Sequence, residues 1–201
     1  MKHARRNFYL LAFTCLLGLS FTGCATTHAP TFYQLEEPVS MELRGVERGL
    51  VVGLELLNIP AYLDRPQIVT RIADHKLFLS ESHMWAEPLK KSITRVVCVN
   101  LSNQLNSNRV FRLPRRDRKL PLDFKVTLAI TRFDGRLGDE ATLNARWSLF
   151  DQNNKPLLTR VSIISQSIDD QDYDTLIIAL NRALFDLSRE IAGAINHLQS
   201  E

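Results

Sequence analysis

The chain has 201 residues, of which 45% are hydrophobic, and a formal net charge of +3. This length fits one domain with a substantial core rather than several domains. Residues 1–23 hold three basic residues and no acidic one, so the rest of the chain carries 22 basic and 22 acidic residues. A neutral chain lacks the positive field on which nucleic-acid binding depends, and we expect no nucleic-acid partner.

The first 23 residues have the layout of a secretory signal peptide. Three basic residues precede an apolar run from Phe8 to Phe21, which at about 14 residues is too short to cross a hydrocarbon core that needs roughly 20. The run ends in Phe21-Thr22-Gly23-Cys24, where small residues precede a cysteine as in the lipobox of bacterial lipoproteins. We predict that residues 1–23 are removed and that Cys24 carries lipid. A plain cleaved signal or an uncleaved anchor is the alternative.

The residues after Cys24 indicate where such a lipoprotein would reside. Ala25 follows the cysteine, whereas an Asp at this position is the commonest inner-membrane retention signal in lipoproteins of Gram-negative bacteria. We therefore expect an outer-membrane anchor with the domain in the periplasm. Residues 24–31 predict a short tether, which keeps the domain close to the membrane. Cys98 is then left without a cysteine partner, and we expect it to be a small buried hydrophobe.

The first half of the domain is predicted to contain strands and one helix. Phe32–Leu35 and Leu50–Ile59 are β-rich, and the second run is apolar almost throughout, as in a central strand. Gln67–Ile72 and Lys76–Ser80 predict a hairpin. Apolar residues spaced three and four apart between Leu89 and Leu105 predict an amphipathic helix.

The second half begins with a short strand at Val110–Leu113. Apolar and polar residues then alternate in Leu122–Thr131 and Ala141–Leu149, and a turn leads into Leu157–Gln166, which together predict an antiparallel meander. A leucine and isoleucine stripe over Leu176–Leu198 predicts a long helix. The order of elements predicts an α+β fold, a single domain over 32–201 with one mostly antiparallel sheet and two amphipathic helices packed on one face.

The acidic run from Asp169 to Asp174 is the strongest candidate for a metal site in the sequence. An EF-hand loop that began at Asp170 would need Gly and Glu where the chain has Thr175 and Asn181. Acidic side chains near the positive end of a helix explain the run without a metal. The chain also has no histidine pair at ligand spacing, no Gly-x-Ser-x-Gly motif and no phosphate loop. We therefore expect no enzyme, no metal and no cofactor.

One basic run stands out in the otherwise neutral domain. It extends from Arg112 to Lys119 and could contact lipid phosphates or an acidic face of a partner protein, since guanidinium groups pair well with both. A solvated loop is the alternative. The candidate binding residues of this run are Arg115, Arg116, Arg118 and Lys119.

Three stretches of the domain carry a family resemblance. They are IPAYLDRPQIVTR (Ile59–Arg71), MWAEPLKKSI (Met84–Ile93) and ITRFDGR (Ile130–Arg136), after a lipobox and a start TFYQL. In this order they resemble the PqiC/YmbA family of ABC-type transport auxiliary lipoproteins over Phe32 to about Leu198. The resemblance implies a non-enzymatic component of an intermembrane transport system, in which an inner-membrane complex and MCE-domain proteins carry lipids or other hydrophobic molecules across the periplasm. It implies an MCE-domain partner and supplies no catalytic residues.

Arg65, Trp85 and Glu87 within these stretches are candidates for binding the partner. A structural role is the alternative that we favour, because a proline before a strand and Pro88 at a helix start have sufficient local explanations, with Trp85 as a packing anchor. Two other functions stay open, a carrier that encloses lipid in an apolar cavity and a periplasmic activator of a cell-wall enzyme. The sequence also leaves a homo-oligomeric ring open.

Overall fold

The computed structural model of the chain describes residues 29–37, 49–114 and 121–200. These residues form one sheet of eight strands and two helices. The helices are α2 (Leu89–Gln104) and α3 (Tyr173–Ser200). The strands are β1 (Thr31–Tyr33), β2 (Val52–Asn58), β3 (Gln67–Ala73), β4 (Lys76–Trp85), β5 (Val110–Arg112), β6 (Phe124–Gly135), β7 (Glu140–Phe150) and β8 (Pro156–Ser167).

The sheet has β6 at its centre and is mixed in direction. The two longest ladders, β6 with β7 and β7 with β8, are antiparallel and form the predicted meander. On its other side β6 pairs in parallel with β2, which pairs in parallel with β5, so β2 has strand neighbours on both sides as predicted. The hairpin of β3 and β4 joins the end of β6 through Thr70 and Gly135, and β1 adds to β4 in parallel.

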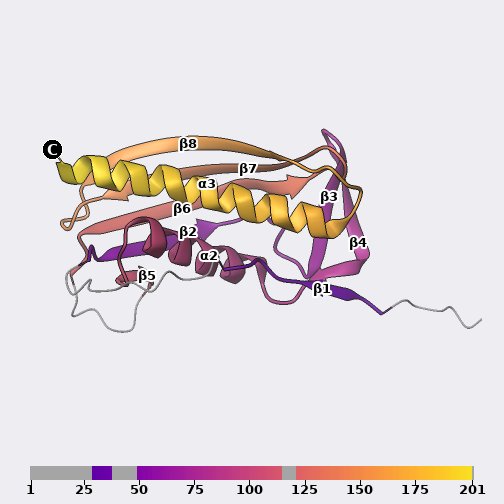
Figure 1. Ribbon diagram of the computed structural model, residues 1–201, viewed down its shortest axis with the longest axis horizontal. Coiled ribbons are helices and arrows are strands. Elements are labelled where there is room, and N and C mark those ends of the chain that lie inside the picture. Colours follow the sequence, from indigo (N-terminus) through magenta and orange to yellow (C-terminus); the bar gives the residue numbers. More distant parts are fainter. Residues whose placement is uncertain (1–28, 38–48, 115–120, 201) are drawn as a thin grey trace, which may run out of the picture.

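Both helices lie on the same face of the sheet, and the predicted α+β class is confirmed (Figure 1). Alternation on β6 turns Val126, Leu128 and Ile130 to the buried side, where α3 covers β6, β7 and β8. Helix α2 covers β2 and β5 and packs against α3. The predicted stripe of α3 is buried from Leu176 to Ile195. No helix of the described residues is long and apolar enough to cross a membrane.

The ends of two elements differ from the prediction. Strand β4 extends to Trp85 instead of ending at Ser80, because its last residues pair with β1. Trp85 therefore ends a strand and does not begin a helix. Pro88 is the N-cap of α2 and precedes the first turn. Proline suits this place as well, since it has no backbone N–H to satisfy and the residue before it is pushed toward extended backbone, which keeps the helix from starting earlier.

The acidic run before α3 caps the helix. The backbone N–H of Thr175 donates to Asp172 Oδ1 over 2.8 Å, as in other helices that begin after an aspartate. This hydrogen bond lowers the pKa of the Asp172 carboxyl. The run thus has a structural role at the start of α3.

Cys98 packs against the core from α2. Burial raises the pKa of its thiol to about 12, against a smaller opposite effect of the Arg112 charge. Because the thiolate is the reactive form, we expect the native protein to react with an aromatic disulfide reagent at least about 100-fold more slowly than the urea-unfolded protein. Absorbance of the released thiolate measures both rates, and equal rates would show that the thiol is open to solvent.

Candidate functional site

A pocket of about 340 Å³ lies where the loop before β3 meets the junction of β4 and α2. Two backbone hydrogen bonds build it. The N–H of Trp85 donates to the Pro66 carbonyl over 2.7 Å, and the N–H of Ala86 donates to the Tyr33 carbonyl over 2.8 Å. The sequence-predicted candidates Arg65, Trp85 and Glu87 are all in its lining, which consists of Asp64, Arg65, Pro66, Trp85, Ala86, Glu87, Pro88 and Leu89.

Trp85 and Glu87 are both engaged within the chain. The Trp85 side chain is 6% exposed and belongs to the hydrophobic core. Glu87 Oε1 accepts a hydrogen bond from Arg95 over 2.7 Å, and Lys91 Nζ lies 3.3 Å from Glu87 Oε2. The hydrogen bond from Arg95 is the main reason why the pKa of Glu87 is lowered. Arg95 also pairs with Glu37 over 2.6 Å, so this cluster fastens α2 to the segment that follows β1.

Arg65 differs from the other two candidates because its side chain is not engaged by the carboxylates Asp64 and Glu87 that line the same pocket. Its Nε atom is buried and has no hydrogen-bond partner, and Arg65 makes none of the ion pairs found among the described residues. The first turn of α2 beside it contains no acidic residue and no side-chain cap, so its free N–H groups add to the positive potential. Arg65 can therefore pair with a carboxylate or another small anionic group that enters the pocket, against the opposing charge of Asp64 in the same lining.

A second cluster was not anticipated from the sequence and surrounds the buried carboxylate of Asp134 on β6. The Tyr62 hydroxyl donates to Asp134 Oδ2 over 2.6 Å. Arg71 donates from Nε to Oδ1 and from Nη2 to Oδ2, both over 3.0 Å, and Arg132 Nε donates to Oδ1 over 3.1 Å. The Asp134 side chain is 0% exposed. These contacts join the stretch Ile59–Arg71 to the stretch Ile130–Arg136.

The charge of Asp134 is fully paired within the fold. Burial alone would raise the pKa of Asp134, but the hydrogen bonds from Arg71 and Tyr62 and the charge of Arg132 outweigh it and hold the pKa below its ordinary value. Burial and the hydrogen bond to Asp134 raise the pKa of Tyr62 far above its ordinary value of 10.0. With every oxygen of the carboxylate occupied by chain donors, the cluster is a clamp between β3, β6 and the loop before β3.

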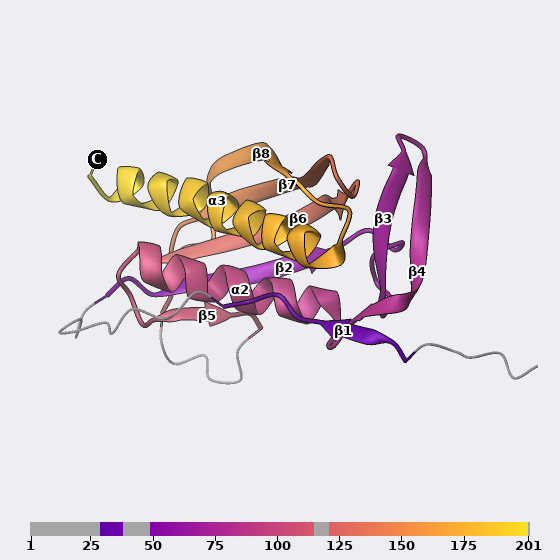
Figure 2. The same ribbon diagram turned by 45° about the vertical axis from the view of Figure 1, so that its right-hand side comes forward.

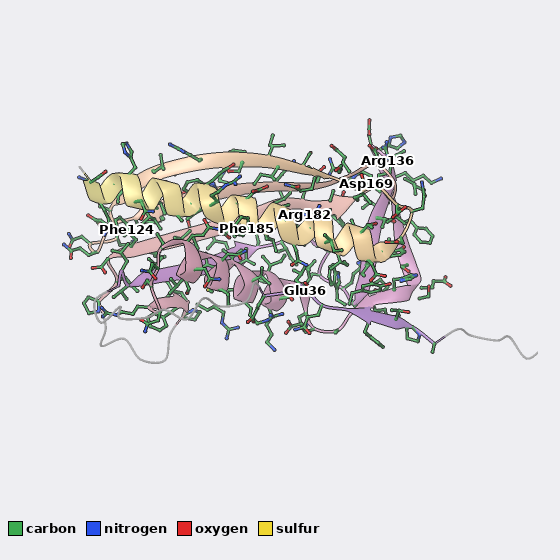
Figure 3. The ribbon with its side chains drawn as sticks, viewed as in Figure 1. Glu36, Phe124, Arg136, Asp169, Arg182 and Phe185 are labelled. Atoms are coloured by element: carbon green, nitrogen blue, oxygen red, sulfur yellow. The ribbon has the colours of Figure 1, made fainter. Side chains whose placement is uncertain are left out.

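Two solvent-open grooves lie along α3. The larger, of about 710 Å³, separates the segment after β1 from α3 and is lined in part by Phe32, Arg95 and Ile178. A smaller one of about 210 Å³ continues toward the C-terminal half of α3, bordered by Glu36, Arg182 and Phe185 (Figure 3). Both combine apolar side chains with charges of either sign.

A family model decides the class of the protein. The model described as ABC-type transport auxiliary lipoprotein component matches residues 33–192. The chain belongs to this family. The match confirms the resemblance seen in the three sequence stretches, and it covers the pocket of Arg65, the Asp134 cluster and most of α3.

Two curated relatives of this auxiliary lipoprotein carry the name intermembrane transport lipoprotein PqiC. The relatives, from Escherichia coli K12 and Shigella flexneri, are each 24% identical to it over 186 residues, which is 91% of this chain and 96% of the relative. Two solved structures share the fold. One is an uncharacterized protein that is 20% identical, with a TM-score of 0.69; the match covers 84% of this chain and 99% of that protein. The other is a protein from Xanthomonas campestris that is 18% identical, with a TM-score of 0.63; the match covers 88% of this chain and 98% of that protein.

The remaining sequence-predicted residues of the auxiliary lipoprotein lie outside the described part of the chain. These are Cys24, with residues 1–28, and the basic residues Arg115, Arg116, Arg118 and Lys119. Arg112, which begins the basic run, is exposed at the end of β5. The lipidation of Cys24 and the binding role of the basic run stay predictions.

Proposed function

We propose that this auxiliary lipoprotein is anchored in the outer membrane and serves as a non-catalytic component of an MCE-type intermembrane transport system, where it docks on a periplasm-spanning partner. The observation that carries the proposal is the family match over residues 33–192, together with relatives named intermembrane transport lipoproteins over 91% of the chain. The lipobox at Cys24 and the following Ala25 support the outer-membrane location.

The pocket beside Arg65 is the docking site that the contacts favour. Trp85 is held in the core and Glu87 is neutralised by Arg95, so neither side chain is available without breaking an internal contact. Arg65 has no such commitment among the described residues. Arginines in small partly desolvated pockets often dominate the affinity of interfaces. We therefore expect the partner to present an Asp or Glu side chain to Arg65.

The packing of the interior gives a lipid-carrier function less support. The space between the sheet and the helices is occupied by large side chains that are fully or almost fully buried, so an acyl chain would have to displace the core. These side chains come from every layer of the domain and include Leu54, Ile93, Leu128, Trp147 and Leu184. The grooves along α3 are open to solvent instead of enclosed by the fold.

A crosslinking pull-down from membranes tests the docking proposal. The full lipoprotein with a C-terminal tag is expected to recover an MCE-domain protein, and Arg65→Glu is expected to reduce that recovery at least about 10-fold, because reversing a charge at an interface costs about 2 kcal/mol or more. Arg146→Glu is the matched control, since Arg146 is exposed on β7 and outside the pocket lining. Recovery should be unchanged in this variant.

Other outcomes of the pull-down contradict the proposal. Recovery of only cell-wall synthases would favour an activator of a cell-wall enzyme, and recovery of lipid without protein would favour a carrier. Native mass spectrometry of the purified lipoprotein adds the number of chains in the assembly. A fixed multiple of one chain is expected for a homo-oligomeric ring, and a single chain would exclude the ring.

A further inference from the structure

The hairpin of β3 and β4 closes one end of the molecule, together with β1 (Figure 1). The C-terminal end of α3 lies at the opposite end, and the hairpin stands across the long axis of the domain (Figure 2). Two large apolar side chains of the hairpin are about half exposed, Ile72 at 52% and Phe78 at 49%. Neither takes part in the core, the pocket of Arg65 or the grooves along α3.

The position of these two side chains follows from their exposure, because strand alternation is interrupted in the hairpin. The register of β3 and β4 shifts between Arg71 and Ala73, so Ile72 lies at an irregularity of the ladder. Phe78 is the register partner of Thr70, which is buried. Ile72 and Phe78 form an exposed apolar pair next to the tip of the hairpin.

The predicted tether leads into the domain at this same end of the molecule. Strand β1 begins at Thr31 and pairs in parallel with the last residues of β4, with Phe32 opposite Met84. A random coil as long as the predicted tether, residues 24–31, spans roughly 15 Å. A lipid on Cys24 would therefore hold β1 and the hairpin near the bilayer surface. Phe32, which is also exposed, adds an aromatic side chain at this end.

The charges of the hairpin tip are compatible with a bilayer surface. Asp74 is the acidic residue of the tip, and its Oδ1 lies 3.5 Å from Nη2 of Arg136, whose position at the top of the hairpin Figure 3 shows. Lys76 is exposed beside it. Arg136 also pairs with Asp139 over 3.2 Å. The two cations Arg136 and Lys76 together match the two carboxylates, so this group gives no net repulsion from anionic headgroups.

We propose that the tip of the β3–β4 hairpin rests on the membrane, with Ile72 and Phe78 inserted at the boundary between headgroups and acyl chains. The inference rests on the proposed lipid anchor, which would hold the domain near the bilayer, and the apolar pair then determines which part of the domain touches it. Apolar and aromatic side chains partition into this boundary in other peripheral proteins. Contact at the hairpin tip would fix the direction in which the domain, with the pocket of Arg65, points into the periplasm.

Site-specific fluorescence tests the proposal in the anchored protein. Phe78→Cys and, separately, Ile72→Cys are labelled with an environment-sensitive dye, and the lipoprotein is reconstituted in vesicles of phosphatidylethanolamine and phosphatidylglycerol. The unaltered chain supplies the background of Cys98. We expect a blue-shifted emission and at least about 3-fold stronger quenching by a lipid-attached nitroxide at either position than at Val161→Cys. Val161 on β8 has a similar exposure of 59%, and equal quenching at all three would overturn the proposal.

A second measurement separates the hairpin from the anchor. The mature chain is exported behind a signal peptide that is cleaved without lipidation, and its sedimentation with the same vesicles is compared with that of an Ile72→Ser, Phe78→Ser double variant. We expect the weak binding of the parent to fall at least about 5-fold, without dependence on salt, because apolar insertion is not screened. Binding that salt abolishes, or that the double variant retains, would overturn the hairpin contact. Absence of lipid on Cys24 would instead overturn the anchor, and the vesicle result would still decide the hairpin.

Discussion

Replacing Asp134 by alanine is expected to lower the free energy of unfolding by about 3 to 5 kcal/mol, which is the usual cost of removing one partner of a buried ion pair. The substitution leaves the guanidinium of Arg71 and the hydroxyl of Tyr62 without their acceptor in the interior. It also releases Arg132. Urea denaturation followed by circular dichroism measures the change, and β3 should lose its fixed position against β6 first.

Two further variants make this prediction specific. Asp74→Ala removes a fully exposed carboxylate whose partner Arg136 lies 3.5 Å away, and it should leave the urea midpoint unchanged because exposed pairs contribute little. Asp134→Asn keeps the size of the side chain and one acceptor oxygen but replaces the other acceptor by an NH2 group, so its loss should be intermediate. A loss below about 1 kcal/mol for Asp134→Ala would mean that the cluster is not a clamp.

The pH dependence of stability follows from the same cluster. Burial raises the pKa of Asp134, but Arg71, Tyr62 and Arg132 together lower it below the ordinary value of 3.8. A carboxyl with a lowered pKa stabilises the fold above its ordinary pKa, and this stability is lost as the pH falls through the folded-state pKa. The difference in stability between the wild type and Asp134→Asn should therefore be constant at neutral pH and shrink below about pH 4.

Periodicity predicted most elements of this fold because they are local. The meander of β6, β7 and β8, the hairpin of β3 and β4 and the stripe of α3 each depend on residues close in sequence. The parallel pairing of β2 with β5 and β6 and of β1 with β4 depends instead on strands that are distant in the chain. Side-chain alternation is the same for parallel and antiparallel neighbours, so the strand order could not be derived from it.

The candidate site shows the same division between local and distant information. Arg65, Trp85 and Glu87 were predicted from local motifs, and the structure places all three at one pocket. The sequence could not show which of the three lacks a partner within the chain. Glu87 meets Arg95 because of the geometry of α2, and Trp85 is buried because the end of β4 pairs with β1.

The Asp134 cluster combines Tyr62 and Arg71, each more than sixty residues away from Asp134 in sequence, with Arg132 from β6 itself. An acidic residue directly after an apolar core position of β6, with arginines and a tyrosine in the companion stretch, is the signal that could have indicated it. Such a residue needs buried partners, because an unpaired buried charge is costly. The sequence alone does not say which arginine or which hydroxyl supplies them.

Loss of the lipid on Cys24 is expected to have the largest effect on function. A chain in which Cys24→Ser is combined with a leader cleaved without lipidation should move from the membrane pellet to the soluble periplasmic fraction, since stable anchoring depends on acyl chains and an exposed apolar pair binds only weakly. We expect transport in cells to be abolished, because the domain is no longer held at the end of the partner that meets the outer membrane. Fractionation and a transport assay on the same strain measure both effects.

The interpretation of this experiment depends on a folded soluble domain. The core is built from residues between Leu35 and Ile195, so the lipid-free chain should unfold in urea at the same midpoint as the lipoprotein. Lost transport at an unchanged midpoint would assign the defect to the anchor. Ala25→Asp separates location from attachment, because it keeps the lipid and should retain the protein at the inner membrane, again without transport. Normal transport by the soluble chain would show that docking at Arg65 is sufficient and that the tether only raises the local concentration of the domain.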